Sequence, residues 1–131
     1  MFERKIDILC RAIAEHEGWF APGEGGFKEG SRSYRHHNPG NLRSSPFAKR
    51  IQDGYAVFTN DIIGMHALQW DIIQKAKGNT VTKLNGDSTL AQLIEVYAPT
   101  ADANNPIQYL LHVQKLTGFS GTMRLAEFLG M

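Results

Sequence analysis

The chain has 131 residues, a length typical of one domain, and 42% of them are hydrophobic, which is enough for an ordinary core. Its formal net charge is +1 at pH 7 with histidine neutral. A small helical DNA-binding protein is therefore disfavoured, because such proteins need a strongly basic surface to attract a polyanion. The five histidines would add positive charge below about pH 6.5.

The amino-terminal segment predicts an amphipathic helix over residues 3–17. Ile6, Leu9, Cys10 and Ile13 follow the i, i+3, i+4, i+7 spacing that puts apolar side chains on one face. Because Cys10 is the only cysteine, no intrachain disulfide can form, and we expect a small buried thiol.

The same segment has no signal-peptide pattern, because charged residues interrupt its apolar ones. No apolar run approaches the roughly 20 residues of a membrane span. We therefore expect synthesis in the cytoplasm, no membrane insertion, and a separate device that carries the protein to any target outside the cell.

The rest of the chain predicts one β-hairpin followed by helices. Residues 20–40, rich in glycine and proline, should form a loop, and residues 41–58 a small hairpin made of NLRSS and GYAVF. The first helix after the hairpin should begin with a cap at Thr59 or Asn60 and run to about Lys77. The second should run from a cap at Asp87 or Ser88 to about Tyr97, before Pro99, and the third from a cap at Asn105 to Gly118. Thr122 should start a short last helix with Leu125, Phe128 and Leu129 inward. The fold class is therefore mainly α, within α+β.

Glu17 extends the apolar face of the first helix. At about 100° per residue it lies within about 40° of the centre of that face, whereas Glu15 lies on roughly the opposite face. A helix carboxyl end disfavours an anion, so both burial and the dipole should raise the pKa of Glu17. A protonated carboxyl near neutral pH is what a glycoside-cleaving enzyme needs as general acid. Alternatively, Glu17 turns to solvent, and Trp19 and Phe20 are core residues and not walls around it.

The stretch SYRHHNPGNLRSS, residues 33–45, contains a tight Asn-Pro-Gly-Asn turn. Its flanks carry many hydrogen-bonding groups that suit the hydroxyl and N-acetyl groups of sugars: His36, His37, Asn38, Asn41 and Arg43. A plain turn is the alternative. Because adjacent histidines rarely bind one ion together, we expect no metal and no cofactor. Farther along, Tyr97 either directs its hydroxyl into a cleft or packs in the core.

These motifs, in this order, resemble the lysozyme-like domains of bacteriophage lysins and virion-associated lytic proteins. The matching features span about residues 6–118 and are a helix ending in Glu-Gly-aromatic, a glycine-rich loop, NPGNLR, GYAVF, GMHAL and YAP…NNP…Y. Many such domains carry an Asn-Asn-Pro-Gly-Asn-Leu/Ile-Arg box, in which His37 here replaces the first Asn.

The resemblance implies a single lysozyme-like domain over residues 1–131, with a helical lobe, a small β-element and a cleft between them. It implies cleavage of the β-1,4 bond between N-acetylmuramic acid and N-acetylglucosamine in peptidoglycan, with Glu17 as the acid. The residues that it places in the substrate cleft are Asn38, Asn41, Arg43 and, by looser analogy, Tyr97.

Two mechanisms remain open. In a lytic transglycosylase, which we favour slightly, Glu17 acts alone and the muramic acid 6-hydroxyl closes a 1,6-anhydro ring. In a hydrolytic muramidase a second carboxylate is needed, and Asp53 is the best candidate by location, although it also suits a simple turn in QDG.

A non-catalytic cell-wall-binding or phage structural module with the same fold is a further alternative. The partner that we expect is the peptidoglycan glycan strand. We expect a monomer that acts on the cell wall and is delivered by a phage particle, a holin or a dedicated secretion machine.

Overall fold

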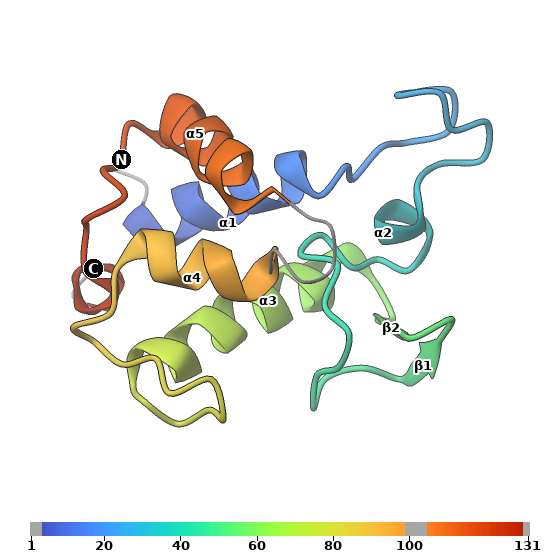
Figure 1. Ribbon diagram of the computed structural model, residues 1–131. Helices are drawn as coiled ribbons and strands as arrows, with labels where there is room; N and C mark the ends of the chain where they lie inside the picture. Colours follow the sequence, from blue (N-terminus) through green and yellow to red (C-terminus); the bar gives the residue numbers. More distant parts are fainter. Residues whose placement is uncertain (1–3, 99–104, 130–131) are drawn as a thin grey trace. The chain divides into compact units, whose positions relative to one another are not determined.

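The computed structural model describes residues 4–98 and 105–129. In chain order the elements are α1 (Lys5–His16), α2 (Arg32–Arg35), β1 (Arg50–Gln52), β2 (Tyr55–Val57), α3 (Asp61–Ala76), α4 (Leu90–Tyr97), α5 (Pro106–Thr117) and the 3-10 helix η2 (Leu125–Phe128) (Figure 1). The prediction of a mainly helical α+β fold with one small hairpin is confirmed.

The chain divides into two compact units. A terminal unit comprises Met1–Leu9 and Ile72–Met131, and a central unit comprises Cys10–Asp71. Helices α1 and α3 contribute residues to both units. Among the described residues, none of the helices combines the length and the apolar character that crossing a bilayer requires.

Helix α1 has the predicted amphipathic pattern. The four residues of its apolar stripe, from Ile6 to Ile13, are each exposed by 2% or less. Cys10 belongs to this stripe and is a buried free thiol, as predicted. Glu15 is exposed, which confirms that the opposite face of α1 meets solvent.

The hairpin of the central unit differs from the prediction in its first strand. Strand β1 pairs with β2 in antiparallel register, with Gln52 opposite Tyr55. Asp53 and Gly54 form the turn with φ values of 54° and 79°, the left-handed pair that a two-residue hairpin turn needs. The prediction of NLRSS as a strand is wrong, because the backbone of Leu42 binds the Asn38 side chain and Ala56 without forming a ladder.

Residues 20–40 are not all loop, because α2 interrupts them. Ser31 precedes this helix with an extended backbone, and its hydroxyl accepts a hydrogen bond from the Tyr34 N–H. The helix ends at His36, whose N–H donates to the Arg32 carbonyl. This single turn places two arginines beside the loop that follows α1.

In the terminal unit, α4 and α5 pack against each other (Figure 1). Helix α4 is capped by Thr89, and the prediction of Asp87 or Ser88 is wrong. Thr89 forms a capping box with Gln92, whereas the Ser88 hydroxyl accepts a hydrogen bond from the Asn85 N–H.

The other predicted helix ends were largely correct. Asn60 caps α3 by accepting from the Ile63 N–H, Asn105 caps α5, and Gly118 ends α5 in a left-handed conformation. Helix η2 buries its first and last residues as predicted, but Leu129 is 39% exposed, so its inward placement was wrong. The predicted stop at Pro99 lies outside the described residues.

Candidate functional site

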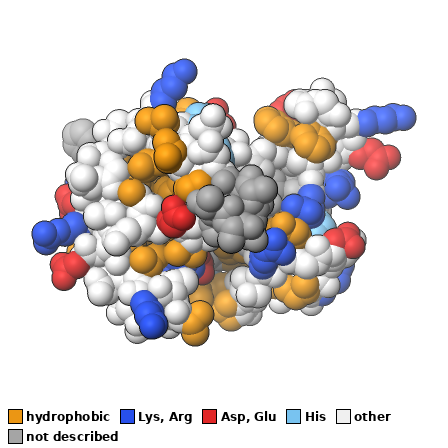
Figure 2. All heavy atoms as spheres, viewed as in Figure 1, with side chains coloured by type: hydrophobic (Ala, Val, Ile, Leu, Met, Phe, Trp, Pro, Cys, Tyr) orange, Lys and Arg blue, Asp and Glu red, His pale blue; other side chains and the backbone are white. Residues whose placement is uncertain are grey.

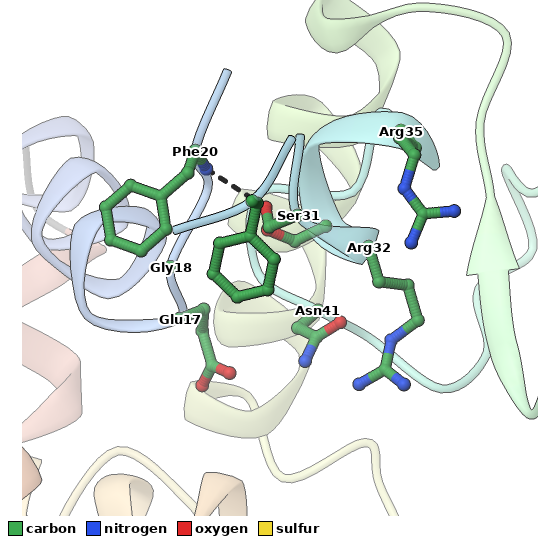
Figure 3. A pocket seen from close by; sticks show the side chains of 9 residues that line it. Glu17, Gly18, Phe20, Ser31, Arg32, Arg35 and Asn41 are labelled. Carbon is green, nitrogen blue, oxygen red and sulfur yellow. Dashed lines mark hydrogen bonds between the residues drawn. The ribbon is translucent and has the colours of Figure 1, made fainter. Parts of the chain in front are cut away.

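Glu17 follows α1 directly and lines a pocket of about 300 Å³ in the central unit. This volume is at the lower end of the range for ligand pockets. The pocket is formed by α2, the loop before it and the NPGN turn, and its lining residues are Glu17, Gly18, Phe20, Phe27, Ser31, Arg32, Ser33, Arg35 and Asn41 (Figure 3).

The end of α1 fixes the position of Glu17. The Glu17 N–H donates to the Ile13 carbonyl at 2.8 Å, so the residue continues the helical hydrogen-bond pattern by one step. Gly18 then turns the chain with a φ of 75°. The side chain is half-buried, unlike that of Glu15. In Figure 3 the Glu17 carboxylate points in the same direction as the ends of the Asn41 and Arg32 side chains.

An aromatic wall borders the pocket. The rings of Phe20 and Phe27 stack with centroids 5.9 Å apart and planes 22° from parallel. The Phe20 N–H donates to the Ser31 hydroxyl at 3.0 Å (Figure 3), and the Ser31 N–H donates to the Phe20 carbonyl at 2.9 Å. Gly25 packs against this ring so closely that an added Cβ would lie 2.7 Å from Phe20 Cδ2. The glycine-rich loop therefore holds Phe20 in place.

The two asparagines of the NPGN turn, Asn38 and Asn41, have different environments. Asn38 is 0% exposed, and its amide nitrogen donates to the carbonyls of Leu42 at 2.8 Å and Ala56 at 3.0 Å. Its amide oxygen accepts from the Leu42 N–H at 2.9 Å. Asn38 was predicted to bind substrate, but its polar atoms are used inside the protein, so the geometry gives it a positioning role.

Asn41, by contrast, lines the pocket. It has a φ of 51°, a conformation that asparagine tolerates better than most residues. Its amide oxygen is buried without a hydrogen-bond partner among the described residues. The structure therefore places Glu17 and Asn41 in the lining of one pocket.

Three other predicted residues lie elsewhere. Arg43 is exposed, and its guanidinium carbon lies 4.7 Å from the centre of the Tyr55 ring. Asp53 is exposed in the hairpin turn and does not line the pocket. Tyr97 ends α4 in the terminal unit, where Lys75 Nζ lies 5.4 Å from the centre of its ring.

The two histidines have separate environments. His36 is 4% exposed, and burial, with the nearby positive charges of Arg35 and Arg32, lowers its pKa against the opposing effect of a hydrogen bond with Ala56 and the charge of Asp53. His37 Nδ1 lies 2.8 Å from Asp61 Oδ1. Within the described residues, no three His, Cys, Asp or Glu side chains come together in a way that could hold a metal ion.

Sequence reasoning missed the residues of α2. Ser31, Arg32, Ser33 and Arg35 all line the pocket, although the segment has no apolar periodicity to mark a helix. The available signal was Ser31, because serine is one of the preferred residues at a helix N-cap.

No protein-family model matches the chain, and neither does any curated protein or solved structure. The chemistry of the pocket therefore carries the functional interpretation. A half-buried carboxyl lies beside aromatic rings, an asparagine amide and two guanidinium groups. Such a set can transfer a proton to a bound ligand while polar and charged groups fix the orientation of that ligand.

Proposed function

We propose that the protein cleaves the β-1,4 bond between N-acetylmuramic acid and N-acetylglucosamine in peptidoglycan, as a lytic transglycosylase with Glu17 as its acid and base. The observation that carries the proposal is the position of Glu17, which follows α1 and lines a pocket with Phe20 and Asn41. A mainly helical chain with a small hairpin after its first helix is consistent with a lysozyme-like fold, which we propose with the function.

In the proposed reaction Glu17 gives its proton to the glycosidic oxygen as the bond from C1 of muramic acid to that oxygen breaks. The 6-hydroxyl oxygen of the same muramic acid then bonds to C1, and its proton returns to Glu17. The ring closes as a 1,6-anhydro sugar, no water is consumed, and the carboxyl ends in its starting state. Phe20 and Phe27 line the same pocket as Glu17, and the raised pKa of Glu17 stays a prediction.

The position of Asp53 favours this route over hydrolysis. A hydrolase of this kind needs two carboxyl groups on either side of one sugar bond. Glu17 is the only acidic residue among the described residues that line the pocket, and Asp53 is exposed in the hairpin turn. We therefore propose a one-carboxylate mechanism, with the muramidase that uses Asp53 as the alternative.

The first experiment is digestion of purified peptidoglycan by the wild type, Glu17→Gln and Glu15→Gln, with the products identified by mass spectrometry. We expect anhydro-muropeptides from the wild type and from Glu15→Gln. Because Glu15 is exposed on the other side of α1, this variant is a matched control for the loss of one carboxylate. Glu17→Gln should lose roughly a hundredfold or more of the activity.

Other products would decide between the alternatives. Reducing-end muropeptides would show hydrolysis and would make Asp53→Asn the next variant. Wall binding without cleavage by any of the three proteins would contradict the enzyme proposal and leave a cell-wall-binding or phage structural module. Circular dichroism of each variant checks that it is folded.

A further inference from the structure

The pocket beside Glu17 is lined by two arginines, Arg32 and Arg35. Neither guanidinium forms an ion pair with an Asp or Glu in the part of the chain that the structure describes. Arginine keeps its charge at every physiological pH. A pocket with two such groups therefore offers positive charge to a ligand.

Contacts within the protein hold both arginines in position. The guanidinium carbon of Arg32 lies 3.6 Å from the centre of the Tyr55 ring, and its Nε is buried without a hydrogen-bond partner among the described residues. Arg35 Nε donates to the Gly30 carbonyl at 3.2 Å. A guanidinium stacked on an aromatic ring keeps its edge open for a carboxylate, which it can bind through two parallel hydrogen bonds.

The direction of the Arg32 side chain agrees with a ligand site. In Figure 3 the guanidinium of Arg32 extends to the same side as the Asn41 amide and the Glu17 carboxylate. Figure 2 shows several Lys and Arg side chains on the face over α2 and the hairpin. An anionic group that reached Arg32 would therefore lie in the same pocket as the proposed acid.

We propose that Arg32 and Arg35 form a subsite for a carboxylate carried by the lactyl arm of muramic acid. This inference rests on the proposed function and specifies its substrate further. N-acetylglucosamine has no charge, whereas every muramic acid residue carries either the free lactyl carboxylate or a peptide whose carboxylates are attached through that arm. The subsite selects peptidoglycan over chitin and places a muramic acid residue beside Glu17.

The test measures binding by calorimetry with Glu17→Gln, so that cleavage does not interfere. The probes are peptide-free glycan strands, the same strands with their lactyl carboxylates converted to methylamides, strands that keep their peptides, and chitin oligosaccharides. We expect the methylamide strands and chitin to bind roughly tenfold or more weakly than the best carboxylate-bearing strands. The comparison of peptide-free with peptide-bearing strands shows whether the subsite binds the free lactyl carboxylate or a carboxylate of the attached peptide.

Arginine variants in the same background locate the subsite. Arg32→Gln and Arg35→Gln should each reduce the preference for carboxylate-bearing strands, and Arg32→Lys should restore part of it. Arg50→Gln removes the same charge from the exposed strand β1, outside the pocket, and should keep the preference. Arg32→Gln also loses the contact of Arg32 with the Tyr55 ring, so its thermal unfolding is measured beside its binding. Arg35 is exposed, so Arg35→Gln supplies an independent variant.

Equal binding of free and amidated strands, absence of binding to every probe, or an unchanged preference in folded Arg32→Gln and Arg35→Gln would overturn the subsite. Wild-type cleavage of peptidoglycan together with any of these results would leave the proposed function intact. Carboxylate-dependent binding that needs both arginines, without cleavage by the wild type, would support the subsite and contradict the enzyme.

Discussion

At the scale of single residues, the two asparagines of the NPGN turn show how one motif serves two purposes. Asn38 is enclosed and makes three hydrogen bonds to backbone groups of Leu42 and Ala56. Asn41, three residues on, lines the pocket, and its amide oxygen is buried without a partner among the described residues. The first supports the loop that carries the second.

These separate roles predict different effects: substitution of Asn38 should lower stability, and substitution of Asn41 should lower activity. Asn38→Ala leaves buried backbone groups unsatisfied and should lower the free energy of unfolding by roughly 3 kcal/mol or more. Asn41→Gly keeps the left-handed backbone and should change stability by less than about 1 kcal/mol while it weakens peptidoglycan cleavage. Urea unfolding and the digestion assay check both variants. Equal stability losses would contradict the separate roles.

At the scale of elements, the sequence predicts the helices whose start and end are marked by residues within or next to the helix. Helix α5 has both ends marked, by Asn105 with Pro106 and by Gly118. Helix α2 has four residues, and Ser31 holds it through hydrogen bonds to both Tyr34 and Phe20, of which the second comes from a segment eleven residues away. A spacing rule within the helix cannot detect such a contact.

The same distinction applies to the site and to the hairpin. Glu17 follows from helical arithmetic, because its position depends only on the residues of α1. The position of the Arg32 guanidinium depends on Tyr55, a neighbour in space that the sequence does not reveal. Strand β1 was misplaced because all three of its residues are exposed, so no alternation of hydrophobicity marks it.

The glycine-rich loop gives a prediction at this scale. Gly25→Ala and Gly26→Ala both introduce a side chain at positive φ, which costs about 1 kcal/mol at either position. Only at Gly25 would the new Cβ meet Phe20, at 2.7 Å, whereas nothing lies within 4 Å of it at Gly26. We expect Gly25→Ala to reduce peptidoglycan cleavage more than Gly26→Ala at matched stability. Equal activity would show that the position of Phe20 does not matter for the reaction.

At the scale of the whole molecule, buried polar residues are distributed unevenly. Ser31, Ser33, His36 and Asn38 are all buried in the central unit, around the elements that build the pocket. These groups need hydrogen bonds to offset the cost of leaving water. The stability of the molecule should therefore respond to a change of charge in the central unit.

His36 makes that response measurable. Burial lowers its pKa in the folded protein, so between its folded and unfolded pKa the unfolded chain binds more protons. The stability that the neutral ring provides is complete above the ordinary pKa of 6.5 and is lost as pH falls through the folded value. Urea unfolding of the wild type from pH 7.5 to pH 5 should show this decline, and His36→Gln should make the profile flatter. His66→Gln, at an exposed position, should keep the slope of the wild type. If His36→Gln keeps that slope as well, the pH dependence arises from other groups.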